Sequence, residues 1–277
     1  MTTCYFVSDL HGSEDKYSML AREIVRNKPS FLFLGGDLLP HIKYSDKQKS
    51  NEVNPFIKEF MVPLFQNLQK QMGCNYPEVF LIAGNDDYKS DVPGFEYGVQ
   101  KELWKFLNSN KVRFGPYHIY GYSYIPPTPF RIKDWEKYDI DGSVNQDCLS
   151  PEVGFRSVPP TQSDSTLISQ DLEILTGNDA MSKAIFMFHS PPHDSLLDRI
   201  KGNKSIGSIA IRNFIDSKQP YITLHGHAHE SSTITGHWNQ QFGRTHSFSA
   251  AYDGIELALI IFQIDNPTQA ERKIIVE

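Results

Sequence analysis

Short apolar runs recur along the chain, and each is followed within a few residues by a glycine or a polar side chain. The runs cover residues 4–7, 31–34, 79–82, 184–188 and 221–224. Apolar runs of this length with little alternation are typical of strands buried on both faces, as in the parallel sheets of α/β proteins. We therefore predict a buried strand for each run.

The segments between these runs carry the spacing of helices. The segment before Pro29 predicts a helix, because its apolar residues recur at intervals of three and four. Residues 56–72 predict a second helix, kinked near Pro63 because proline has no amide hydrogen to donate. Further helices are predicted at about 100–108, 165–175 and 208–217.

The rest of the chain has weaker patterns. Short strands are predicted near residue 112 and at 118–122, 233–234, 246–249, 255–264 and 273–276. Residues 43–54 are polar and are interpreted as an exposed loop, whereas residues 123–160 are rich in Pro, Gly, Asp and aromatic residues and show no periodicity. A loop as long as the second one is usually functional or poorly ordered. With no internal repeat and no linker, the pattern indicates a single α/β domain over residues 1–277.

Composition and charge narrow the function. The 277 residues are 39% hydrophobic and 22% charged, as in an ordinary globular protein. The formal net charge of −6 argues against extended nucleic acid or an anionic membrane as a partner. A catalytic metal centre is compatible with this charge, because bound cations offset carboxylates locally.

The cysteines and the N-terminal segment give further limits. Cys4, Cys74 and Cys148 are odd in number and form no CxxC pair, which argues against a disulfide framework and against a zinc ribbon. The chain enters its first strand without a basic leader, and no apolar run reaches the roughly 18 residues that span a bilayer. We expect a cytoplasmic protein with no membrane segment.

Side chains that bind metals follow five of the predicted strands. They are Asp9, His11, Asp37, Asn85, His189, His225, His227 and His229. Ligand sites of α/β sheets form at the carboxyl ends of strands, so we expect these groups to meet. The set contains carboxylates, an amide and imidazoles but no thiolate, which suits Mn, Fe, Zn, Ni or Co. There are enough donors for two metal ions, and one aspartate could bridge them.

The order of these groups resembles the calcineurin-like metallophosphoesterase superfamily. The matching blocks are Asp9-x-His11, Gly35-Gly36-Asp37, Gly84-Asn85, His189 and Gly226-His227-Ala228-His229. Residues 122–129 and 189–192 are also similar to the Icc-like phosphoesterase branch. The resemblance implies a four-layer α-β-β-α sandwich of two mixed sheets flanked by helices, with the metal site at the carboxyl ends of the strands.

The resemblance also implies a ligand assignment and a reaction. One metal would take Asp9, His11, Asp37 and His229, and the other would take Asp37, Asn85, His189 and His227. A hydroxide that bridges the two ions would attack phosphorus, so the expected activity is phosphoester hydrolysis, with phosphodiesters favoured over monoesters. A nuclease and a catalytically weak interaction module are the alternatives. The expected partner is a small phosphorylated or nucleotide-like substrate, and nothing indicates an oligomeric state.

The chain departs from the superfamily pattern after Asn85. A histidine usually follows that asparagine and is the expected general acid, but here the residue is Asp86. Nearby cations would lower the pKa of Asp86 and make it a poor proton donor. His193 and His225 are alternative candidates for the proton donor.

Two further residues are candidates for substrate contact, as is Asn85. Ser208 precedes a predicted helix whose N-terminus could attract phosphate, although a helix cap without a ligand is the simpler reading. Trp135 in the long loop could wall a substrate pocket, or it could cover the core.

Overall fold

Two six-stranded mixed sheets form the centre of the computed structural model, which describes residues 2–47 and 52–276. The first sheet has the order β14-β13-β1-β2-β3-β4. Its strands are β1 (Thr3–Val7), β2 (Phe31–Gly35), β3 (Glu78–Ile82), β4 (Lys105–Phe106), β13 (Leu257–Gln263) and β14 (Asn266–Ile275). Strands β1 to β4 are parallel, and the antiparallel pair β13–β14 extends the sheet beyond β1.

The second sheet has the order β11-β12-β10-β7-β6-β5. Its strands are β5 (Asn110–Phe114), β6 (Tyr117–Tyr122), β7 (Ala184–Phe188), β10 (Ile222–His225), β11 (Asn239–Phe242) and β12 (Thr245–Ser249). The four central strands are parallel, and β5 and β11 are antiparallel edge strands. A separate hairpin joins β8 (Arg199–Ile200) to β9 (Lys204–Ser205).

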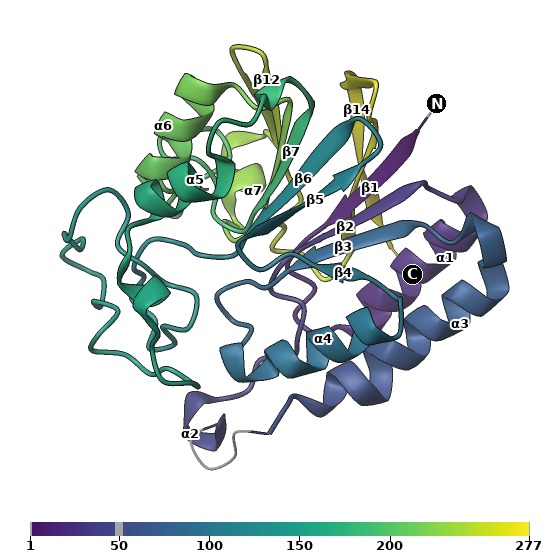
Figure 1. Ribbon diagram of the computed structural model, residues 1–277, viewed down its shortest axis with the longest axis horizontal. Coiled ribbons are helices and arrows are strands. Elements are labelled where there is room, and N and C mark those ends of the chain that lie inside the picture. Colours follow the sequence, from purple (N-terminus) through teal and green to yellow (C-terminus); the bar gives the residue numbers. More distant parts are fainter. Residues whose placement is uncertain (1, 48–51, 277) are drawn as a thin grey trace.

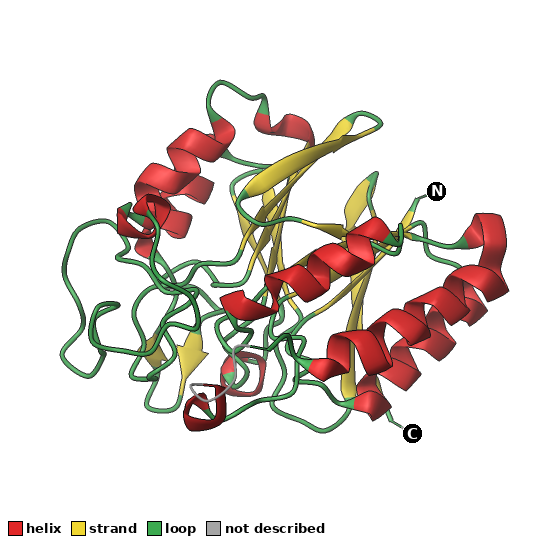
Figure 2. Ribbon diagram, turned by 60° about the horizontal axis from the view of Figure 1, so that its bottom comes forward, coloured by secondary structure: helices red, strands yellow, loops and turns green. Residues whose placement is uncertain are grey.

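Helices cover the outer side of each sheet (Figures 1 and 2). The first sheet is covered by α1 (Glu14–Asn27), α3 (Val62–Met72) and α4 (Val92–Gln100), and the second by α5 (Ile168–Thr176) and α6 (Ile209–Lys218). The short helices α2 (Tyr44–Lys47) and α7 (Ser231–Thr235) lie in connections. This arrangement confirms the α-β-β-α sandwich. Among the described residues, no helix combines the length and the apolar character needed to cross a membrane.

The strands formed by the five predicted runs are mostly apolar because both of their faces are buried. Cys4 and Phe6 of β1 point into the cluster between the two sheets, whereas Tyr5 and Val7 point into the cluster under the helices. Alternate residues of a strand face opposite sides, so a strand between another sheet and a helical layer needs apolar residues at every position. The uninterrupted runs in the sequence have this origin.

The helix predicted at 100–108 is wrong. Helix α4 ends at Gln100, and Lys105–Phe106 pairs with β3 instead. The chain turns at Glu102, which has a φ of 57°, and Trp104 folds back over Gly98, where a Cβ would lie 1.9 Å from the indole. The spacing of apolar residues along the sequence does not indicate that a side chain packs back against α4.

The tail prediction also needs correction. Residues 233–234 belong to helix α7 rather than to a strand, and the amide of Ile234 donates to the carbonyl of Glu230. The strand that pairs with β12 at this edge is β11, which the sequence pattern did not indicate. Its sequence Asn-Gln-Gln-Phe has little apolar character, because it is an edge strand and only Phe242 is buried.

The stretch 43–54 is not a simple exposed loop. Residues 44–47 form α2, and the Nζ of Lys47 lies 2.7 Å from Oδ1 of Asp91 in a fully buried ion pair. Asp91 also accepts the amide of Asn54, which is buried. Part of the predicted loop, residues 48–51, lies outside the described residues.

The long loop at 123–160 contains neither a helix nor a regular strand, but it is well anchored. Lys133 and Glu136 form a buried ion pair of 2.5 Å, and Glu136 also accepts the amide of Thr128 at 2.8 Å. Asp134 accepts the amides of Lys89 and Ser157. The chain is thus tied by buried polar contacts rather than by a regular ladder of backbone hydrogen bonds.

Candidate metal centre

The carboxyl ends of β1, β2, β3, β7 and β10 meet where the two sheets face each other. Backbone hydrogen bonds join the segments that follow these strands. The amide of Asp9 donates to the carbonyl of Gly36 at 3.0 Å, and the amide of Gly226 donates to the carbonyl of His189 at 3.0 Å. The strand ends that the sequence placed together therefore do lie together.

The backbone at this edge is unusual. Asp9, Asp37 and His227 have φ values of 57°, 52° and 71°, a left-handed conformation that is uncommon for residues with a side chain. The backbone at Gly84 also lies very close to Asp37, because a Cβ at Gly84 would be 2.2 Å from Oδ1 of Asp37. The surrounding hydrogen bonds hold this strained backbone, and the result is a set of side chains turned toward one another.

The first group of donors consists of Asp9, His11, Asp37 and His229. Their ligand atoms all lie within 4.8 Å of one another. The Nε2 atoms of His11 and His229 are 3.2 Å apart, and Nε2 of His229 is 3.1 Å from Oδ1 of Asp9. Two imidazole nitrogens that face each other at this distance need a proton or a cation between their lone pairs, so the geometry fits a metal ion.

The second group consists of Asp37, Asn85, His189 and His227. The Nε2 of His189 lies 3.3 Å from Oδ2 of Asp37 and 3.1 Å from Oδ1 of Asn85. The ring of His227 lies 5.4 Å from that of His189 between centroids. Nδ1 of His189 donates to the carbonyl of Gly35 at 2.9 Å, which leaves Nε2 directed at the other donors.

Asp37 belongs to both groups, as a bridging ligand must. Burial raises the pKa of the carboxyl groups of Asp9 and Asp37, but the neighbouring histidines outweigh it. His229 holds the pKa of Asp9 well below its usual range, and His189 lowers that of Asp37 to about 2. Burial lowers the pKa of His227 to about 3. Both carboxylates are therefore charged and His227 is neutral, the states in which these groups bind metals.

His189 carries a proton in the absence of a cation. Burial lowers its pKa, but Asp37 and Asp9 more than compensate and raise it to about 10. A metal ion at Nε2 would replace that proton and interact with the same carboxylates. The donor set therefore fits cations, since the carboxylates of Asp37 and Asp9 favour a positive charge where the second ion would bind.

Asp87 holds two of these segments together. It is fully buried, and its carboxylate accepts the amides of Leu38, Leu39 and Gly84 at 2.9–3.2 Å. Burial and the nearby Asp37 raise its pKa to about 8, and cations beside Asp37 would oppose that shift. Asp87 was not among the site residues predicted from the sequence. Its one signal in the sequence is that it is an acidic residue directly after Asp86.

Asp86 stands where the superfamily pattern has histidine. Its amide donates to Oδ1 of Asp37 at 2.8 Å, and its carboxylate lies 3.8 Å from Nδ1 of His11. Burial and Asp37 raise its pKa to about 6, whereas bound cations would act in the opposite direction. The side chain is 26% exposed, so it faces whatever enters the site.

His225 faces away from the other histidines. Its Nδ1 lies 2.9 Å from the carbonyl of Ser190, its Nε2 lies 2.8 Å from the hydroxyl of Thr223, and its ring stacks on Phe188. It is fully buried, and burial lowers its pKa to about 4. Both ring nitrogens are engaged within the core, so this position does not support the proton-donor role of His225, which stays a prediction.

We expect this histidine to make folding sensitive to acid. The pKa of His225 falls from about 6.5 unfolded to about 4 folded, so the unfolded chain binds the extra proton and stability is lost as pH falls from 6.5 toward 4. Between pH 7 and 5 the loss from this group is roughly 2 kcal/mol. Urea unfolding at both pH values should show a smaller pH effect in His225→Gln than in wild type. His237→Gln, at an exposed histidine, should keep the wild-type effect, and an equal effect in all three proteins would refute the assignment.

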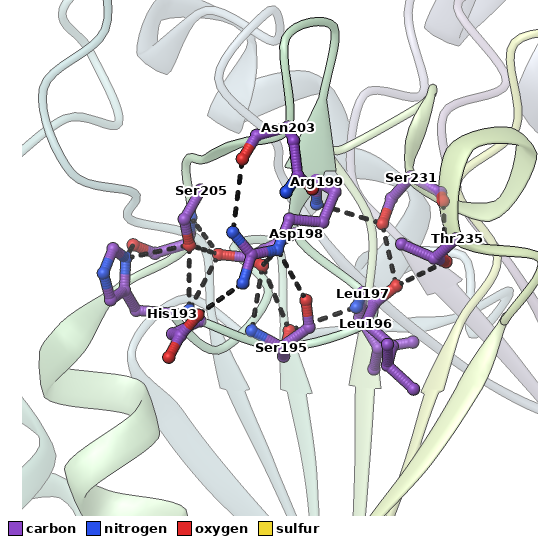
Figure 3. A network of polar contacts seen from close by, with 12 residues as sticks. His193, Ser195, Leu196, Leu197, Asp198, Arg199, Asn203, Ser205, Ser231 and Thr235 are labelled. Carbon is purple, nitrogen blue, oxygen red and sulfur yellow. Dashed lines mark hydrogen bonds and ion pairs between the residues drawn. The ribbon is translucent and has the colours of Figure 1, made fainter.

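His193 lies in a polar network around Asp198 (Figure 3). Its Nδ1 is 3.2 Å from both the hydroxyl of Ser205 and the carbonyl of Gly207. The hydroxyl of Ser205 donates in turn to Asp198, which is fully buried and also accepts the amide of Ser195. The network fixes the ring of His193, and a proton-donor role for this residue stays a prediction.

The two predictions of substrate contact outside the strand ends stay predictions, and the structure shows another role for each side chain. Ser208 is buried, and its hydroxyl caps α6 by accepting the amide of Ile211. Asp139 accepts the amides of Ile209 and Ala210, so the helix N-terminus already has an anion. Trp135 is 1% exposed and covers the core, where no ligand could stack on it.

The fold and the donor groups define a class of protein, a metal-binding α/β sandwich with its ligands at strand ends. A family model described as calcineurin-like phosphoesterase matches residues 2–231. The chain belongs to this family. Membership supports metal-dependent hydrolysis of phosphoesters and implies a dinuclear site of divalent metals, for which the first donor group is the candidate.

Solved structures share the fold. TT1561 of Thermus thermophilus is 13% identical, with a TM-score of 0.59 over 99% of this chain and 98% of that chain. A dimetal phosphatase from Danio rerio is 9% identical, with a TM-score of 0.53 over 94% of this chain and 91% of that chain. No curated protein matches the chain. At these identities the similarity concerns the fold alone.

Proposed function

We propose that the protein hydrolyses phosphodiesters with two metal ions held by the two donor groups. The observation that supports this is the position of Asp37, whose ligand atoms lie beside His189 and within the group that contains His229. When bound, the ions would lower the pKa of water and neutralise charge on the phosphate. The mixed oxygen and nitrogen donors suit Mn, Fe, Zn, Ni or Co. A small phosphorylated substrate in the cytoplasm remains part of the proposal.

The preference for diesters rests on Asp86. Its partly exposed carboxylate lies 3.8 Å from Nδ1 of His11, and its amide donates to Asp37, so the side chain stands beside the place where the phosphate would bind. A phosphomonoester carries up to two negative charges at neutral pH and a diester carries one, so a carboxylate at this place repels the monoester more. The other side chains of the site would bind the metal ions and orient the substrate, and none of them would supply the nucleophile.

The test compares two aryl substrates with the metal-loaded protein. We expect kcat/KM for bis-p-nitrophenyl phosphate to exceed that for p-nitrophenyl phosphate by about tenfold, the effect of roughly 1.4 kcal/mol of charge repulsion. Asp86→Asn removes the charge and keeps the shape, so it should lower the ratio of kcat/KM for the diester to kcat/KM for the monoester. A monoester preference in wild type, or a ratio that Asp86→Asn leaves unchanged, would contradict the proposal.

The same residue predicts a dependence on the leaving group. Cations near Asp86 keep it ionised, so the leaving oxygen departs without an efficient proton donor. We expect log kcat to fall steeply as the pKa of the leaving phenol rises across a series of aryl diesters. Asp86→His should flatten this slope, because imidazole can donate a proton near neutral pH. A flat slope in wild type would show that another acid operates, and His193 would be the next residue to test.

A further inference from the structure

A cavity of about 480 Å³ adjoins the metal centre on the side of Asp86. It is lined by His41, Lys43, Ser45, Asp86, Pro129, Phe130, Arg131 and Ile132. One wall comes from the segment that leads into α2, and the other comes from the long loop, two parts of the chain that lie near each other in Figure 1. The volume is within the range of roughly 300–1,000 Å³ of small-molecule sites.

The cavity is continuous with the donor groups through Asp86. The backbone of Asp86 is held by Asp37 at 2.8 Å, and its carboxylate lies 3.8 Å from His11. The same side chain lines the cavity. A phosphate held at the metal ligands would therefore lie next to this space, with Asp86 between them.

The wall from the long loop is preformed. Residues 129–132 lie between Thr128 and Lys133, and both of these residues are tied to the buried carboxylate of Glu136. Lys133 also donates to the carbonyl of Thr128 at 2.8 Å, which closes the segment on itself. A buried ion pair with its hydrogen bonds satisfied is costly to break, so the wall does not need to be ordered by a ligand.

The opposite wall is anchored in a similar way. The buried ion pair between Lys47 and Asp91 fixes the end of α2. The hydroxyl of Tyr88 donates to the carbonyl of Ile42 at 2.7 Å, one residue before Lys43. Two separate polar anchors in different parts of the chain thus hold the two faces of one cavity.

The lining has a definite chemistry. The lining contains two cationic side chains, Lys43 and Arg131, and one carboxylate, that of Asp86, in a chain whose net charge is −6. Phe130 is 59% exposed although it is aromatic, and Pro129 and Ile132 flank it with apolar surface. Cations beside an exposed aromatic ring suit a ligand with an anionic group and a planar ring.

We propose that this cavity binds a nucleoside that carries a second phosphate in addition to the one at the metal centre. The base stacks on Phe130, and Lys43 with Arg131 holds the second phosphate. The long loop is then the element that selects the substrate. This inference rests on the proposed phosphodiesterase function for the position of the first phosphate.

A matched pair of chromogenic substrates tests the proposal. Thymidine 5′-(p-nitrophenyl phosphate) and its 3′-phosphorylated derivative differ only in the second phosphate. We expect kcat/KM to be about tenfold higher for the 3′-phosphorylated compound. Calorimetric binding of thymidine 3′,5′-bisphosphate and thymidine 5′-monophosphate gives a readout that does not require turnover, and the bisphosphate should bind about tenfold more tightly.

Two variants separate the contributions. Lys43→Gln should weaken binding of the bisphosphate, because it removes a charge that only the second phosphate uses. The ratio of the two kcat/KM values and the ratio of the two affinities should then both move toward one. Phe130→Ala should weaken both nucleotides by a similar factor of about ten, because both carry the base. Lys70→Gln, at an exposed lysine of α3 outside the cavity, is the matched control and should behave as wild type.

The outcomes distinguish the two proposals. Equal binding and equal turnover of the paired compounds, or ratios that survive Lys43→Gln, would overturn the assignment of the cavity even if bis-p-nitrophenyl phosphate is hydrolysed. Absence of diester hydrolysis together with Lys43-dependent binding of the bisphosphate would overturn the proposed activity and support the cavity as a nucleotide site.

Discussion

Asp37→Asn is expected to lower diester hydrolysis by more than roughly 100-fold, since loss of even an outer partner of a metal ligand costs about 10–100-fold. Asp37 is the one carboxylate with ligand atoms in both donor groups, and its Oδ2 lies 3.3 Å from His189. Asparagine keeps the shape but has one oxygen donor and no charge. It would therefore fail to join two cations, and we expect the purified variant to bind less than two metal ions per chain.

Metal analysis and kinetics on the same preparation check this prediction. Asp15→Asn, at an exposed position in the first turn of α1, is the matched control and should keep both metals and full activity. Thermal unfolding of the apo-proteins shows whether the fold is retained. An Asp37→Asn protein with two metals and wild-type turnover would refute the bridging assignment.

Asp87→Ala is expected to cause the second large effect. The substitution leaves the buried amides of Leu38, Leu39 and Gly84 without their acceptor, at about 1–3 kcal/mol for each unsatisfied group. We expect the free energy of unfolding to fall by roughly 3 kcal/mol or more. Because the same amides flank Asp37 and Asn85, metal affinity should fall as well.

Asp87→Asn is the graded companion of this variant. It keeps one acceptor oxygen, so its losses of stability and of metal affinity should lie between wild type and alanine. Urea unfolding of the apo-protein measures the structural part, and metal titration of the folded protein measures the positioning part. If Asp87→Ala unfolds like wild type, the carboxylate does not hold the two segments together.

The sequence was most informative where burial on both faces of a strand determines the residue type. The five buried strands are mostly apolar, with Thr223 and His225 of β10 as buried polar exceptions, because each strand lies between a helical layer and the other sheet, as Cys4 and Tyr5 show on opposite faces of β1. It was least informative where distant contacts decide. The packing of Trp104 on Gly98 and the buried pairs of the long loop leave no periodic trace. That the chain is a single domain stays a prediction.

The donor residues of the candidate site could be picked out from the sequence, but the arrangement of the three histidines at the end of β10 could not. His225, His227 and His229 alternate in sequence, and an extended chain would place them on one face. The chain leaves β10 at His225, and His227 adopts a φ of 71°, so the alternation ends there. His225 turns into the core, while His227 and His229 lie beside different partners, His189 and Asp9.

In the proposed function, two metal ions joined by Asp37 are needed for diester hydrolysis. The most direct measurement strips the protein with a chelator and follows bis-p-nitrophenyl phosphate turnover while one metal at a time is titrated back, with bound metal quantified in each sample. We expect no turnover without metal and full turnover at two ions per chain. Turnover by the metal-free protein, or full turnover at one ion per chain, would contradict it.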